Sequence, residues 1–244
     1  MKKIAVILGP TGVGKTKTSI LLAKKINGEI ISADSMQIYK GLNIGTAKIT
    51  EEEKSGVIHH MIDIKNFDEN YNVWQFVNDA RMLIDDIISR GKTPIIVGGT
   101  NLYISALTQN YDFGKTELPD DAYTLKNQVE YHLFALNLPR EELYQRLNKR
   151  VDQMIEDGLE KEVKNLQNQG LKAEMQAGRS IGYKELLDYY TGACTREYAI
   201  DKIKQHNRNF AKRQLTWLRS MTNLTWLDAY KLEDNVEVIY NNII

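Results

Sequence analysis

Three short apolar runs in the first part of the chain predict strands that are buried on both faces. Residues 4–8 are Ile-Ala-Val-Ile-Leu, residues 29–33 are Glu-Ile-Ile-Ser-Ala, and residues 94–97 are Pro-Ile-Ile-Val. Continuous runs that are rich in β-branched residues are typical of strands in a parallel sheet whose two faces are covered by helices. A fourth strand is predicted at residues 132–138.

Helices are predicted from a different spacing of the apolar positions. Residues 15–26 carry an apolar face, and residues 71–90 repeat apolar side chains at intervals of three and four positions. From Pro139, a helix start, the pattern predicts helices alone. The later helices are expected at 157–169, 181–190 and 196–219. This order predicts an α/β fold, a parallel sheet flanked by helices with a helical C-terminal part.

Composition is that of an ordinary globular protein, with 244 residues of which 42% are hydrophobic. The 32 basic and 32 acidic residues cancel, so any nucleic-acid contact has to come from a local cluster of charge. The single cysteine, Cys194, allows no internal disulfide and fits a reducing cytoplasm. The first apolar run ends at Gly9 and is too short for a signal peptide or a membrane span. We expect a cytoplasmic monomer with no membrane contact.

Residues 9–16 match the phosphate-binding pattern G-x-x-x-x-G-K-[ST] between a predicted strand and a predicted helix. The glycines let successive backbone N–H groups turn toward an anion, and Lys15 adds a full charge. The Thr16 hydroxyl can ligate a Mg²⁺ that bridges phosphate oxygens. The residues predicted to bind a diphosphate are Gly9, Thr11, Gly12, Val13, Gly14, Lys15 and Thr16. The alternative is a glycine-rich turn that only joins the strand to the helix.

Two further polar residues follow predicted strands, where ligands bind in an open parallel sheet. Asp34 comes directly after the second strand and can hold Mg²⁺ through water or accept a proton. Its alternative role is that of a turn carboxylate. Thr100 follows the third strand, which ends in two glycines rather than in a metal-binding Asp. That ending argues against an ATPase and leaves Asp34 as the only well-placed carboxylate.

Seven segments occur in order along nearly the whole chain. They are GPTGVGKT at 9–16, SADSMQIY at 32–39, GTAK at 45–48, HHMID at 59–63, GGTNLY at 98–103, RSIGYK at 179–184 and KRQLTWLR at 212–219. Together they closely resemble the tRNA dimethylallyltransferases, also called tRNA isopentenyltransferases. The combination is far more specific than the phosphate-binding pattern alone.

The resemblance implies transfer of a dimethylallyl group from dimethylallyl diphosphate to N6 of the adenosine 3′ of a tRNA anticodon. It implies that the phosphate-binding loop and Mg²⁺ hold the donor diphosphate, and that the tRNA anticodon stem-loop is the partner. On matching positions, Asp34 would accept the amine proton, Thr100 would hold donor or base, and Arg179 would stabilise the leaving pyrophosphate. Contacts to the tRNA base are implied for Asp34, Ser35, Gln37, Tyr39 and Thr100. Tyr39 could equally be a packed aromatic.

A basic stretch is predicted to contact RNA phosphates, because no acidic residue occurs between positions 202 and 226. Its candidate residues are Lys204, Arg208, Lys212 and Arg213. The alternative is a solvated helix face opposite an apolar one. For His59 and His60 a structural role is favoured over a metal site, because no third ligand occurs at metal spacing.

The chain departs from the family where members carry a longer helical insertion that grips the anticodon stem-loop. We expect residues 1–110 to form the P-loop α/β core, 111–131 a remnant of the insertion, and 132–244 the remainder of the core with the C-terminal helices. The short segment mildly favours a rival, an adenylate isopentenyltransferase that acts on a free nucleotide, whereas the basic helix and the match at Gln37 and Tyr39 favour tRNA. The other rivals are a small-molecule P-loop kinase and a non-catalytic RNA-binding protein.

Overall fold

The structure, a computed structural model, describes residues 1–109 and 124–244. Within these residues all neighbouring strands are parallel, in a six-stranded sheet of order β3-β2-β4-β1-β5-β6. The strands are β1 (Lys2–Leu8), β2 (Gly28–Ala33), β3 (His59–His60), β4 (Thr93–Gly98), β5 (Val129–Asn137) and β6 (Leu224–Asp228). The expected α/β fold, a parallel sheet flanked by helices, is confirmed.

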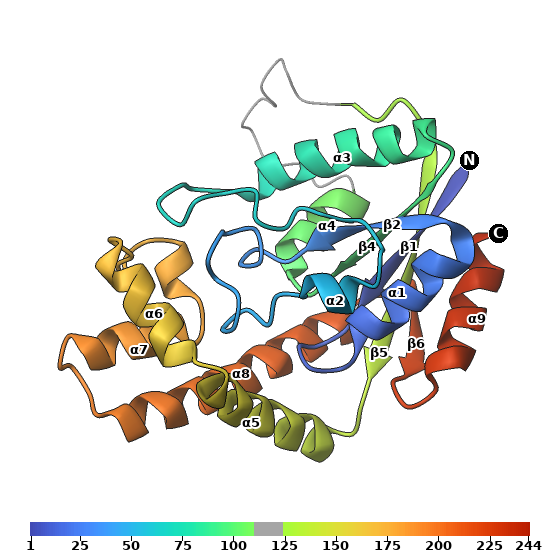
Figure 1. Ribbon diagram of the computed structural model, residues 1–244. Helices are drawn as coiled ribbons and strands as arrows, with labels where there is room; N and C mark the ends of the chain where they lie inside the picture. Colours follow the sequence, from blue (N-terminus) through green and yellow to red (C-terminus); the bar gives the residue numbers. More distant parts are fainter. Residues whose placement is uncertain (110–123) are drawn as a thin grey trace.

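Helices cover both faces of the sheet, as the continuous apolar runs require. On one face α1 (Lys15–Ile26) packs beside α9 (Leu232–Ile243), and on the other α3 (Val73–Ser89) packs with α4 (Asn101–Thr108) (Figure 1). The short α2 (Glu51–Lys54) lies in the long connection between β2 and β3. The central strand β1 is fully buried from Ile4 onward because both layers cover it.

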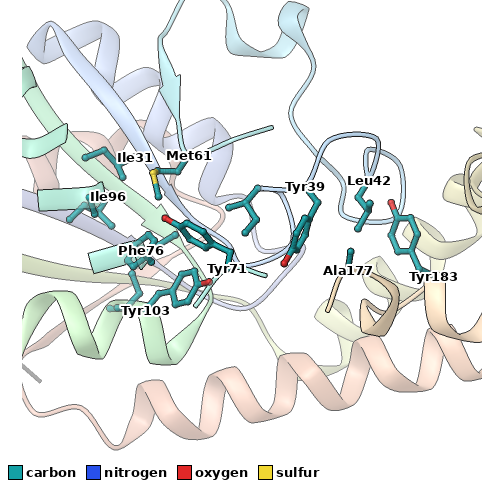
Figure 2. Close-up of a cluster of buried hydrophobic side chains, with 14 of the residues drawn as sticks. Ile31, Tyr39, Leu42, Met61, Tyr71, Phe76, Ile96, Tyr103, Ala177 and Tyr183 are labelled. Atoms are coloured by element: carbon teal, nitrogen blue, oxygen red, sulfur yellow. The ribbon is translucent and has the colours of Figure 1, made fainter. Parts of the chain in front are cut away.

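The remaining helices form a lobe beside the sheet (Figure 1). They are α5 (Arg140–Glu156), α6 (Leu159–Asn168), a 3₁₀ turn (Ala177–Arg179), α7 (Tyr183–Tyr190) and α8 (Arg196–Arg219). One buried cluster joins this lobe to the sheet, since it includes Ile31 and Ile96 of the strands as well as Ala177 and Tyr183 of the lobe (Figure 2). The lobe and the sheet therefore share a core.

The predicted helices at 15–26 and 196–219 agree with α1 and α8 at both ends. The expectation that residues beyond Pro139 are all helical is wrong for β6, which pairs with β5 at the edge of the sheet. This strand has no apolar run because only Leu227 of its five residues is buried. Residues 111–123, which are most of the expected insertion remnant, lie outside the described residues.

Candidate functional site

The phosphate-binding loop connects β1 to α1 at the carboxyl edge of the sheet. Gly9, Gly12 and Gly14 have φ angles of 142°, 78° and 106°, which side chains with a Cβ rarely adopt. A Cβ on Gly12 would lie 3.1 Å from the side chain of Leu147 in α5, so that helix packs directly against the loop. A cavity of about 510 Å³ opens over the loop, bordered also by the ends of β2 and β4 and by α5 and α8.

Lys15 lies inside this cavity. Its Nζ donates hydrogen bonds to the carbonyl oxygens of Gly9 at 2.8 Å and Pro10 at 2.9 Å. Burial lowers the pKa of Lys15 to about 8, although the nearby carboxylate of Asp34 opposes the shift and the guanidinium of Arg150 adds to it. The lysine is therefore a positive group in a partly buried setting, which strengthens its attraction for an anion.

The hydrogen bonds of Asp34 show the turn role and leave one carboxylate oxygen open to the other role that its sequence position allows. Its Oδ1 accepts hydrogen bonds from the backbone N–H of Met36 at 2.9 Å and of Gln37 at 3.2 Å, which build the turn after β2. Within the described residues Oδ2 accepts no hydrogen bond, and Asp34 lines the cavity. One oxygen thus shapes the backbone, and the other remains available for chemistry.

Thr100 connects the loops after β2 and β4. Its Oγ1 accepts a hydrogen bond from the N–H of Ser35 at 3.1 Å and donates one to the Ser35 hydroxyl at 3.4 Å. The preceding glycines, Gly98 and Gly99, line the cavity itself. Gln37 also lines it, with its amide Nε2 donating to the carbonyl of Thr46 at 3.2 Å.

Of the two interpretations of Tyr39, the structure supports the packed aromatic. Its side chain is fully buried and lies in the shared core near Leu42 and Ala177 (Figure 2). Burial raises the pKa of Tyr39 to about 12. In this structure the ring of Tyr39 contributes packing and does not line the cavity, and the base contact implied by the resemblance stays a prediction.

Arg179 ends the 3₁₀ turn, and the structure leaves its side chain exposed and outside the lining of the cavity. A different arginine enters the cavity. Arg150 of α5 reaches in beside Lys15, and its Nη1 donates to the hydroxyl of Thr11 over 3.5 Å. Sequence reasoning missed Arg150, although a signal was present. An arginine three positions after Leu147 and one before Val151 stands on the apolar side of its helix.

Sequence reasoning also missed Gln214, which holds the phosphate-binding loop in place. Its Oε1 accepts a hydrogen bond from the N–H of Thr11 at 3.0 Å, and its Nε2 donates to the carbonyl of Gly99 at 2.9 Å. A Cβ on Gly99 would lie 2.2 Å from that Nε2, so only glycine leaves room for the amide. One buried side chain of α8 therefore joins the ends of β1 and β4.

The four basic residues of α8 that were predicted to contact RNA divide into two pairs. Lys204 forms an ion pair with Asp152 at 2.5 Å, and Arg208 donates to the Asn148 side chain at 2.6 Å, so both bind α5. The second pair is exposed and borders a surface hollow of about 520 Å³ beside Trp217. This pair is Lys212 and Arg213.

The structural role expected for the histidine pair agrees with their contacts. His60 Nε2 lies 2.7 Å from a carboxylate oxygen of buried Glu29, and His59 Nδ1 lies 2.9 Å from the carbonyl of Val57.

Among residues 1–109 and 124–244 no group of three or more His, Cys, Asp or Glu could hold a metal ion. A Mg²⁺ that is coordinated by substrate phosphates needs only one or two protein ligands. Thr16 and Asp34, the candidate ligands, line the same cavity. The residues present fit that ion.

A parallel sheet with a phosphate-binding loop at the end of its central strand defines a P-loop protein of NTPase-like fold. The family model described as IPP transferase matches residues 37–132 and 116–221. A tRNA dimethylallyltransferase of Anoxybacillus flavithermus is 43% identical over 282 residues, covering 93% of this chain and 90% of that protein. The chain belongs to the IPP transferase family, whose curated relatives are tRNA dimethylallyltransferases.

Solved structures agree with this assignment. The crystal structure of a tRNA isopentenylpyrophosphate transferase from Bacillus halodurans has a TM-score of 0.91 and 38% identity, covering 100% of this chain and 97% of that one. A eukaryotic dimethylallyltransferase acting on tRNA has a TM-score of 0.81 and 30% identity, covering 96% of this chain and 75% of its own. In the described part of this chain, no helix is both long and apolar enough to cross a membrane.

Proposed function

We propose that the protein transfers a dimethylallyl group from dimethylallyl diphosphate to N6 of the adenosine 3′ of the anticodon in tRNA. The observation that carries this proposal is the convergence of a phosphate-binding loop and the Asp34 carboxylate in one cavity. Its relatives bear the name tRNA dimethylallyltransferase, and one structural neighbour is described as acting on tRNA, which supports an RNA acceptor over a free nucleotide.

The phosphate-binding loop would hold the donor diphosphate. As the allylic C–O bond breaks, negative charge accumulates on pyrophosphate, and the loop N–H groups and Lys15 lie where they can stabilise it. Mg²⁺, held by the Thr16 hydroxyl and by Asp34 through water, would add charge stabilisation when bound. The loop is preorganised, because Gln214 fixes the N–H of Thr11 without any ligand.

Asp34 would act as the general base. The exocyclic amine of adenine is a poor nucleophile, so removing its proton as the new C–N bond forms helps the reaction by about 10² to 10⁴-fold. The unbonded Oδ2 is the oxygen placed for this role, since Oδ1 already accepts two backbone hydrogen bonds. Asp34 is also where Mg²⁺ and the acceptor base would meet.

The acceptor adenine must leave the stacked anticodon loop and enter the cavity. Gln37 lines that cavity and carries an amide that can read an adenine edge, while Thr100 and Ser35 form the neighbouring hydroxyl pair. The exposed Lys212 and Arg213 are the cations best placed for RNA phosphates. We expect a monomer that works in the cytoplasm, and we retain Arg179 as a prediction for pyrophosphate.

The first experiment offers the protein dimethylallyl diphosphate and Mg²⁺ with either an anticodon stem-loop RNA or AMP, followed by mass analysis of the nucleosides. Prenylated adenosine in the RNA alone supports the proposal. Prenylated AMP alone would assign the activity of the adenylate enzyme instead. Absence of product with both acceptors, from protein that still binds pyrophosphate, would reduce the finding to a phosphate site.

A further inference from the structure

We propose that Glu162 of α6 is a positioning residue for the acceptor base, an inference that rests on the proposed prenyl transfer. Its carboxylate holds the loop of residues 43–48, and this loop in turn sets the orientation of the Gln37 amide in the cavity. Glu162 belongs to the helical lobe and is not among the described residues that line the cavity. The lobe thereby acts on recognition of the base without touching the base.

The carboxylate of Glu162 is bound by three successive backbone N–H groups. Its oxygens accept hydrogen bonds from the N–H of Asn43 at 3.1 Å, of Ile44 at 2.9 Å and of Gly45 at 3.3 Å. Successive N–H groups that converge in this way form a nest for an anion. The buried Tyr183 hydroxyl donates a fourth hydrogen bond at 2.5 Å. The four groups that bind this carboxylate in the described part of the chain are therefore all donors.

The loop is closed by hydrogen bonds of its own, so a hold on its first residues also fixes the residues that follow. The Thr46 hydroxyl donates to the carbonyl of Leu42 at 2.6 Å. The N–H of Ala47 donates to the carbonyl of Ile44 at 3.0 Å. Ala47 has a φ angle of 48°, which a residue with a Cβ adopts only with support from its surroundings. Thr46 and Ala47 line the cavity, so the contact with Glu162 fixes one of its walls.

The loop determines which atom of the Gln37 amide is free to bind a ligand. Nε2 donates to the carbonyl oxygens of Thr46 at 3.2 Å and Ala47 at 3.5 Å. Because carbonyl oxygens only accept, the amide nitrogen must be the atom that faces the loop. Within residues 1–109 and 124–244 the Oε1 atom accepts no hydrogen bond. A free acceptor suits the N6 amine of adenine and opposes the O6 oxygen that guanine carries in its place.

Gln37 connects this loop to the proposed general base, because its backbone N–H donates to Asp34 Oδ1 at 3.2 Å. The amine of adenine carries two hydrogens. One passes to Asp34 as the new C–N bond forms and the allylic C–O bond breaks, with the electron pair of that bond leaving on pyrophosphate. The other stays on the nitrogen, where Gln37 Oε1 accepts it. A loop held by Glu162 thus presents the amine to the base.

The test compares Glu162→Gln with the matched control Glu160→Gln. Both glutamates are half-buried on α6, but Glu160 pairs with Arg196 of α8 at 2.8 Å. Glu162→Gln keeps the shape of the side chain and turns an NH₂ group toward backbone donors. We expect it to lower kcat/KM for the anticodon stem-loop RNA by about 10- to 100-fold, as loss of hydrogen bonds to a charged group does. Pyrophosphate affinity by calorimetry should stay within about twofold, and the control should keep both values.

Two further variants test whether Glu162 acts through the loop and Gln37. Tyr183→Phe removes one of the four donors and should cause a smaller loss in the same direction. Gln37→Ala combined with Glu162→Gln should be about as active toward RNA as Gln37→Ala alone, because both changes remove one interaction. Losses that multiply in the double variant would overturn the inference. An equal fall in pyrophosphate affinity would also overturn it, since Glu162 would then only support the fold.

Failure of the proposed function can be told apart from failure of this inference. An unmodified protein that makes no prenylated RNA refutes the proposed function. Fluorescence anisotropy with the anticodon stem-loop RNA then still judges Glu162. Weaker binding by Glu162→Gln than by Glu160→Gln supports the inference, and equal affinities of the two variants overturn it.

Discussion

At the scale of single residues, some side chains of the candidate site can be predicted from a local sequence motif, and others cannot. The phosphate-binding loop and Asp34 were predictable because each lies directly after a buried strand. Gln214 was not predictable, since it bonds Thr11 across 203 positions of sequence and only the fold brings them together. Tyr39 lies near Asp34 in sequence, yet its ring turns into the core.

The two oxygens of Asp34 allow its chemical role to be separated from its structural one. Asp34→Asn keeps an Oδ1 that can accept from Met36 and Gln37 but removes the basic oxygen. We expect kcat for prenyl transfer to fall by about 10² to 10⁴-fold while donor affinity and Tm stay unchanged. The exposed Asp68→Asn serves as the control. Full activity of Asp34→Asn would show that Asp34 is not the base.

The lowered pKa of Lys15 predicts a pH dependence for pyrophosphate binding. Below about pH 8 the lysine is protonated and attracts the anion, and above that pH it becomes neutral. Affinity measured by calorimetry should therefore fall as pH rises through 8, by up to about tenfold per pH unit for one linked proton. Lys15→Arg stays charged over this range and should lose the transition. A flat profile for the unmodified protein would contradict the expected titration.

At the scale of elements, α8 positions the other parts of the candidate site through its contacts. It holds the loops after β1 and β4 through Gln214 and holds α5 through Lys204 and Arg208. The helix itself followed from its spacing of apolar residues, and its bounds agree with the structure. The contacts of α8 could not be predicted from the sequence, because a basic helix face has the same residue pattern whether it binds RNA or a neighbouring helix. The edge strand β6 was missed for the reason that most of it is exposed.

Gln214→Ala should loosen the phosphate-binding loop, because it leaves the N–H of Thr11 and the carbonyl of Gly99 without their partner. We expect a loss of about 1 to 3 kcal/mol in the free energy of unfolding and weaker pyrophosphate binding. Gly99→Ala should produce a similar defect, since its Cβ would displace the amide.

The contact of Gln214 with Gly99 is tested further by a double-mutant cycle. Gln205→Ala, on the exposed side of α8, is the control variant. Combining Gln214→Ala with Gly99→Ala should cost clearly less than the sum of the two single variants, because both remove the same contact. Strictly additive losses would mean that the glycine and the glutamine act independently.

At the scale of the whole molecule, the parallel sheet flanked by helices and the family could be anticipated, but the size of the lobe could not. The alignment with the Anoxybacillus relative extends over 282 residues, more than the 244 of this chain, so that relative has residues without a counterpart here. This agrees with the expected shortening of the insertion.

The amino end of β2 carries a buried ion-pair cluster, in which Glu29 is bound by Arg90, Lys92 and His60.

The Glu29 cluster predicts sensitivity to acid. Hydrogen bonds from Arg90, and then from Lys92 and His60, hold the pKa of Glu29 far below its usual range despite burial. A depressed carboxyl pKa stabilises the fold above the unfolded value of about 4.5, and this contribution is lost as pH falls below it. Glu29→Gln should lower the free energy of unfolding at pH 7 by about 3 to 5 kcal/mol, and flatten its decline in acid.

Urea unfolding at pH 7 and at pH 4 measures both effects. Glu237→Gln, which removes an exposed ion pair with Lys25, is the control and should change stability by at most about 1 kcal/mol. An equally small loss for Glu29→Gln would show that the buried cluster contributes no more than a surface pair.

The core that passes from the sheet into the lobe has a consequence for cooperativity. Ile31, Tyr39 and Tyr183 belong to one buried cluster, so we expect the lobe and the sheet to open together (Figure 2). Amide protons in β2 and α7 should therefore exchange with deuterium at the same free energy, in a single opening event. The helices that carry Arg150 and Gln214 would then keep their place over the phosphate-binding loop for as long as the molecule remains folded.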